Sequence, residues 1–176
     1  MSRLSLLAVL ALVAVGCSND SPAPAAPSAP PNKFVFTATL LPANEVPPIT
    51  NAENTGSGQA TLTMNVTRDS SQQITSATID VTATFTNFPP GTQITAAHIH
   101  TGAAGVAGGI LVSMAPAPGE VTMPNGSGSY VKSGFPITPV DNANTIINNP
   151  AGFYFNVHTS LNPGGVARGQ LVRTSS

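Results

Sequence analysis

The three histidines are the residues whose types and spacing best suit metal chemistry. His98 and His100 are two positions apart at the end of the strand-like segment 94–100, and His158 ends a second such segment, 153–158. Side chains at i and i+2 of a strand point to the same face. If the two strands are neighbours, the imidazoles gather on one outer face and could hold copper or zinc. The alternatives are a polar exposed face and hydrogen bonds to nearby loops.

Glu45 and Arg168 are charged residues in a chain of which only 7% is charged. Glu45 lies in the proline-rich segment 41–48, and a structural salt bridge or a solvated loop charge is the favoured interpretation. Arg168 enters a strand between glycines, and a structural anchor is favoured over contact with an anion. The glycine-rich segment 102–109 has no following lysine, so it is interpreted as a flexible hairpin tip and not a phosphate loop. No catalytic residue is assigned, because neither a nucleophile elbow nor paired carboxylates can be identified.

Cys17 is the only cysteine of the chain and ends an apolar run that follows Arg3. A basic start, about a dozen apolar residues and small residues before the cut are typical of a secretory signal peptide. A membrane span needs about 20 apolar residues, which this run lacks. The cysteine after residues 14–16 resembles the lipobox of bacterial lipoproteins. That resemblance implies a signal peptide at 1–16, a lipidated Cys17 with a Pro/Ala-rich tether over 17–32, and an extracytoplasmic domain anchored in the cell envelope, at the outer membrane. The alternative is an ordinary signal peptide with a chance cysteine.

The composition excludes several classes of function. The chain has 176 residues and a formal net charge of −1. Nucleic-acid binding requires a Lys/Arg patch that releases counterions, and the chain has only six Lys and Arg residues. Because no cysteine follows Cys17, the folded domain has no disulfide, thiolate nucleophile or cysteine metal ligand. Any metal site in the domain must therefore rest on the histidines.

The elements that must position these residues are strands. Apolar and Thr-rich positions alternate with period two, which is typical of half-buried antiparallel strands. We predict an all-β domain over 33–173, an antiparallel Greek-key sandwich or barrel of about eight strands, with one short helix near 139–148. The expected strands are 34–39, 60–66, 78–85, 94–100, 109–114, 127–132, 153–159 and 166–173.

Four motifs in a fixed order resemble the CHRD domain, a family named for chordin and widespread in bacterial secreted proteins. The resemblance covers about 33–172 and implies an all-β domain, without a well-defined biochemical activity. The motifs are Asn-Glu-Val-Pro-Pro at 44–48, Ala-His-Ile-His-Thr-Gly at 97–102, Phe-Asn-Val-His-Thr at 155–159 and Gly-Val-Ala-Arg-Gly-Gln-Leu at 165–171.

A weaker resemblance is to the sandwich of copper/zinc superoxide dismutase, which also has His-x-His on a strand and a later Val-His. It implies that His98, His100 and His158 are similar to three copper ligands, and Arg168 to an anion-guiding arginine. The fourth copper histidine, the zinc-binding loop and the cysteine pair of that family have no counterpart here. The resemblance therefore carries over positions and not activity.

Three functions are compatible with the sequence. The favoured one is a non-enzymatic, envelope-anchored binding or structural module with a copper or zinc site at His98, His100 and His158. The second is a dismutase-like copper redox enzyme, and the third is a purely structural or adhesive domain in which the histidines make only internal hydrogen bonds. The membrane is the one expected partner, through the lipid on Cys17.

Overall fold

The computed structural model describes residues 29–175. The predicted signal peptide, the predicted lipid anchor at Cys17 and most of the predicted tether lie outside the described residues. The described strands are β1 (Lys33–Leu40), β2 (Ser57–Arg68), β3 (Ile74–Thr86), β4 (Thr92–Thr101), β5 (Ile110–Ser113), β6 (Val121–Met123), β7 (Gly128–Pro136), β8 (Phe153–Thr159), β9 (Ala167–Gln170) and β10 (Val172–Ser175). The helices are α1 (Asp141–Asn148) and three 3-10 turns, Pro42–Asn44, Ala52–Thr55 and Pro150–Gly152.

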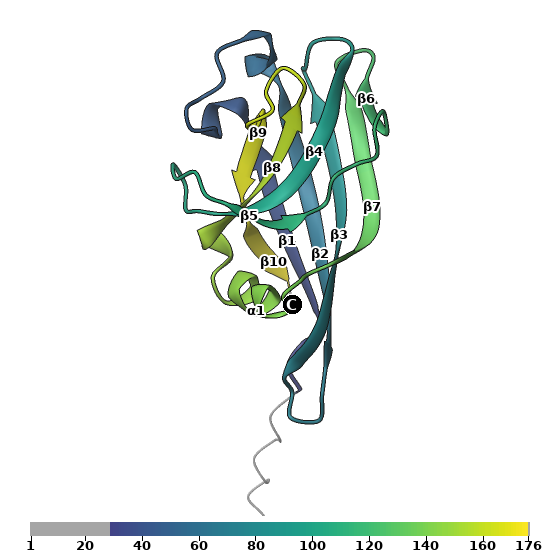
Figure 1. Cartoon of the computed structure of the whole chain (residues 1–176), viewed down its shortest axis with the longest axis vertical. Coiled ribbons are helices and arrows are strands. Elements are labelled where there is room, and N and C mark those ends of the chain that lie inside the picture. The colour runs from purple at the N-terminus through teal and green to yellow at the C-terminus, as the bar shows by residue number, and fades with distance from the viewer. Residues whose placement is uncertain (1–28, 176) are drawn as a thin grey trace, which may run out of the picture.

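Two antiparallel sheets form a sandwich (Figure 1). One sheet has the strand order β10-β1-β2-β3-β7, and the other has the order β5-β4-β8-β9, with β6 also paired to β4. Of the two all-β architectures expected from the sequence, the structure has the sandwich and not the closed barrel.

The alternating pattern of the sequence places one face of each long strand in a shared core. Along β2, for example, Ala60, Leu62 and Met64 are buried, whereas Gln59 and Thr61 are exposed. Burying apolar surface contributes about 25 cal/mol per Å², so this face fixes the register of the strand. β8 is the exception, because all seven of its residues are buried. Both faces of β8 are therefore covered, and its outer face carries His158.

The structure has ten strands where about eight were predicted. β6 is only three residues long and was not anticipated. The segment expected as one strand at 166–173 is divided at Leu171, which is 1% exposed. β9 pairs with β8 in one sheet and β10 pairs with β1 in the other, so the chain passes between the two sheets at this buried leucine. A period-two pattern cannot reveal such a crossing, because both halves remain extended.

The short helix predicted near 139–148 is confirmed as α1. It buries Ala143 and Ile146 against the core and leaves its polar residues outside. In the described part of the chain, no helix has the length and apolar character needed to cross a membrane.

Candidate metal site

The three histidines come together because β4 and β8 are antiparallel neighbours. In their register His98 is opposite Asn156 and His100 is opposite Tyr154, while His158 is opposite Ala96. Ala97, Ile99 and Val157 alternate with these residues and are fully buried in the core. The histidines therefore share the outer face, as the spacing predicted.

The distances between the rings are close to those that one shared ion requires. Nδ1 of His98 and Nε2 of His158 are 3.0 Å apart and form a hydrogen bond, which an ion bound to both nitrogens would replace. One ring nitrogen from each of His98, His100 and His158 can be chosen so that all three lie within 4.8 Å of one another. Two nitrogens that bind the same zinc or copper ion at about 2.0–2.1 Å are at most about 4.2 Å apart, so the rings would have to rotate slightly to bind one ion together.

Backbone carbonyls orient two of the rings. Nδ1 of His100 is 3.0 Å from the Gly108 carbonyl oxygen, and Nδ1 of His158 is 2.9 Å from that of Pro163. A carbonyl only accepts, so each of these nitrogens carries the proton and each Nε2 presents a lone pair. Nε2 of His100 is buried and has no hydrogen-bond partner in the described part of the chain. Metal-binding histidines characteristically donate their second ring N–H to a carbonyl or a carboxylate in this way.

The environment keeps all three rings neutral, which is the form that binds metal. Burial, reinforced by the neighbouring His158 and His100 rings, lowers the pKa of His98 from 6.5 to about 4. Burial also lowers the pKa of His100, against the opposing effect of its hydrogen bond to Gly108. The same balance of burial and a carbonyl partner lowers the pKa of His158. Protons consequently compete poorly for these nitrogens at mildly acidic pH.

The segment 102–109 connects the paired strands β4 and β5, as the expected hairpin tip would, and makes several hydrogen bonds to its surroundings. It folds back over the outer face of β8. The Gly108 carbonyl meets His100, the Gly108 N–H donates to the Tyr154 hydroxyl at 3.2 Å, and the Val106 carbonyl accepts from Arg168. A Cβ on Gly108 would collide with the Thr101 carbonyl oxygen, so only glycine permits this close return of the chain.

Gly108→Ala is expected to weaken zinc binding by at least about tenfold, because it displaces the carbonyl that orients His100. Gly109→Ala is the matched control, since a Cβ there meets no atom within 4 Å. Calorimetric titration of both variants with zinc measures the difference. Equal affinities would contradict the role given to the Gly108 carbonyl.

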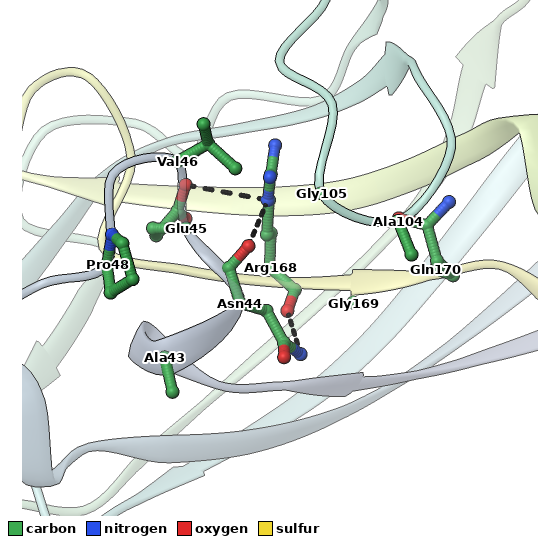
Figure 2. Close-up of a pocket in the computed structure, with 10 residues that line it drawn as sticks. All are labelled: Ala43, Asn44, Glu45, Val46, Pro48, Ala104, Gly105, Arg168, Gly169 and Gln170. Atoms are coloured by element: carbon green, nitrogen blue, oxygen red, sulfur yellow. Dashed lines mark hydrogen bonds and ion pairs between the residues drawn. The ribbon is translucent and has the colours of Figure 1, made fainter.

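Arg168 and Glu45 lie on the same side of the sandwich but outside the histidine cluster. Nε of Arg168 donates to the Asn44 carbonyl at 2.6 Å and is 3.8 Å from Oε2 of Glu45 (Figure 2). Its guanidinium carbon is 4.5 Å from the centre of the Tyr154 ring, which in turn stacks on His100 at 5.0 Å. Burial raises the pKa of Glu45 to about 7, despite the opposing attraction of Arg168.

Tyr154 and Asn156 also lie on the outer face with the histidines, and no role was assigned to them from the sequence. Tyr154 separates the histidine cluster from Arg168, and Asn156 stands between His98 and Arg168 in the register of β4, β8 and β9. The roles of Gly108 and Pro163 were missed because each acts through its backbone carbonyl, for which a side chain carries no signal.

The fold and this cluster define an all-β sandwich module with three histidines gathered on the outer face of one sheet. A family model described as the CHRD domain matches residues 36–171. The chain therefore belongs to the CHRD domain family. No curated protein and no solved structure matches the chain, so the resemblance to copper/zinc superoxide dismutase stays a prediction.

Proposed function

We propose that this CHRD domain is an extracytoplasmic binding module that holds one copper or zinc ion through His98, His100 and His158. The observation that carries the proposal is Nε2 of His100. It is buried without a hydrogen-bond partner among the described residues, it lies beside two further imidazoles, and the Nδ1 of the same ring is held by a carbonyl. A buried polar atom without a partner costs about 1–3 kcal/mol, and bonding to a metal would remove that cost.

The donor set favours these two metals by its chemistry. Neutral imidazole is a ligand for copper and zinc, whereas magnesium and calcium require oxygen ligands. Three protein ligands leave a further position for water or a partner's side chain. The module would thus be stabilised by its ion and could present that ion at its surface.

The proposed location rests on Cys17 and its neighbours. A lipid on Cys17 would hold the domain at the bacterial outer membrane. The Pro/Ala-rich tether over 17–32 would keep the domain at a distance from that membrane. Mass spectrometry of the protein from its native envelope tests this directly. We expect an N-terminal cysteine carrying a diacylglyceryl group, and we expect Cys17→Ala to release the protein from the membrane fraction. An unmodified mature terminus elsewhere would contradict the anchor.

The metal is tested by calorimetric titration of the chelator-treated and desalted protein with zinc and with copper. We expect one ion per chain, and we expect elemental analysis of protein from the native envelope to find the same stoichiometry. Absent binding would overturn the proposal and favour the purely structural or adhesive domain. Binding that persists when all three histidines are replaced would also overturn the proposal, because the ion would then lie elsewhere.

A copper redox enzyme is the second candidate, favoured by the stack that links His100, Tyr154 and the cationic Arg168. In this function His98, His100 and His158 would hold a copper ion, which would supply the electron transfer by which two superoxide ions and two protons give dioxygen and hydrogen peroxide. The copper-loaded protein should then turn over superoxide, and Arg168→Ala should slow the reaction and increase its dependence on salt through lost steering. Copper binding without superoxide turnover would contradict the redox enzyme and support the binding module.

A further inference from the structure

A second feature of the molecule lies beside the histidine cluster and shares no residue with it. A partly open cavity of about 400 Å³ lies where the turn that carries Glu45, the 102–109 segment and β9 meet (Figure 2). Small-molecule sites in proteins have volumes of about 300–1,000 Å³. The cavity is therefore large enough for a small organic molecule.

Two buried polar side chains that line this cavity each have one atom without a hydrogen-bond partner among residues 29–175. Arg168 is 3% exposed and uses Nε for the Asn44 carbonyl and Nη1 for the Val106 carbonyl, but Nη2 has no hydrogen-bond partner. Glu45 is 7% exposed, and its Oε1 also has none. Figure 2 shows the two side chains next to each other, with Gly105 on the far side of the guanidinium. Leaving such groups unsatisfied is costly, which points to a ligand that satisfies both.

We propose that this cavity binds a small organic carboxylate, with one oxygen accepting from Nη2 of Arg168 and the other accepting from a protonated Glu45. The short apolar part of the ligand would lie against Ala43, Val46, Pro48 and Ala104. The site does not depend on a metal at the histidines.

The charges around Glu45 support a single negative charge on the ligand. Arg168 of β9 is the charged group that faces Glu45, with Tyr154 of β8 and then His100 of β4 stacked behind it. The 102–109 segment contains no titratable residue. In the 156–165 region, the residues beside the Glu45 carboxylate are Asn156 and Gly165. Burial raises the pKa of Glu45 to about 7, so below that pH its carboxyl is neutral and the charge of Arg168 is not balanced.

The number of donors favours a carboxylate over phosphate or sulfate. The two unused N–H groups of Nη2 and the carboxyl O–H of Glu45 are enough for the two oxygens of a carboxylate, whereas a phosphate dianion would need further cations. Arg168 is the one cationic residue that lines the cavity. Above pH 7 the ionised Glu45 would repel the ligand, and affinity should fall by about tenfold per pH unit.

The test is calorimetric titration of the metal-stripped, desalted protein with benzoate at pH 5.5, 7 and 8.5, with the neutral isostere benzamide as the control ligand. We expect benzoate to bind most tightly at pH 5.5 and to lose about tenfold per pH unit above 7. Benzamide should not bind. Absent binding of benzoate, equal binding of benzamide, or equally tight binding of phosphate would each overturn the proposal.

Two variants identify the site. Glu45→Gln carries a permanently neutral side chain, so we expect it to bind benzoate with the same affinity at all three pH values. Ala104→Leu fills the apolar part of the cavity without removing a side-chain hydrogen bond, and it should weaken binding by at least about tenfold. If Glu45→Gln keeps the pH dependence of the wild type, or if Ala104→Leu binds normally, the ligand lies elsewhere and the proposal is wrong. Because the protein is metal-free, neither result depends on whether the histidines hold an ion.

Discussion

We expect His100→Ala to abolish most of the thermal stabilisation that zinc gives to the wild-type protein. Loss of the carbonyl that orients a histidine costs about 10–100-fold in affinity, and loss of the ligand itself costs more. Zinc at about a thousand times its dissociation constant stabilises the native state by about 4 kcal/mol, and at about ten times by about 1.4 kcal/mol. For a domain of this size the difference corresponds to roughly 5–10 °C in melting temperature.

The measurement is a pair of melting curves, with and without zinc, for each protein. Comparing the shifts separates the metal from any loss of stability that the substitution itself causes. Gln93→Ala is a suitable control, since Gln93 is an exposed residue of the same strand β4. It should keep the wild-type shift. A His100→Ala protein that melts with the full zinc-dependent shift would contradict the site.

Much of the sandwich could be predicted because its signals are local. Leu62 and Met64 alternate with Thr61 and Thr63 in the sequence. In the structure the apolar residues of this pattern are the buried ones. The shared face of His98 and His100 follows from the same period. Their meeting with His158 required one further assumption, that β4 and β8 are neighbours, and the register confirms it.

What could not be predicted depends on contacts that are distant in sequence or made by the backbone. The burial of His100 and His158 on an outer face comes from segments that fold over β8 and contribute the Gly108 and Pro163 carbonyls. The cavity beside Arg168 likewise exists because its N–H groups reach Asn44 and Val106, which are 124 and 62 residues away. No side-chain pattern encodes these carbonyl partners.

The second large effect that we expect is the pH dependence of the free energy of unfolding. The histidines and Glu45 change this free energy in opposite directions. The pKa of His98 falls from 6.5 to about 4 on folding, and those of His100 and His158 also fall. Below pH 6.5 the unfolded chain binds more protons at these rings, so stability is lost as pH falls toward 4. The pKa of Glu45 rises from 4.5 to about 7, so its ionisation in the unfolded chain lowers stability as pH rises from 4.5 to 7.

Denaturant unfolding of the metal-free protein at pH 4, 6 and 8 measures both effects. We expect Glu45→Gln to be more stable than the wild type at pH 8, by on the order of 1–3 kcal/mol, and to lose this advantage at pH 4, where the native and unfolded carboxyls are both protonated. His98→Asn should lose less stability than the wild type between pH 6 and pH 4, because it lacks one of the histidines whose pKa falls on folding. The steepest acid destabilisation is therefore expected in Glu45→Gln, because the opposing carboxyl is gone and the histidines alone set the slope. A Glu45→Gln protein whose stability follows the wild-type curve at every pH would show that Glu45 does not titrate with a raised pKa in the folded state.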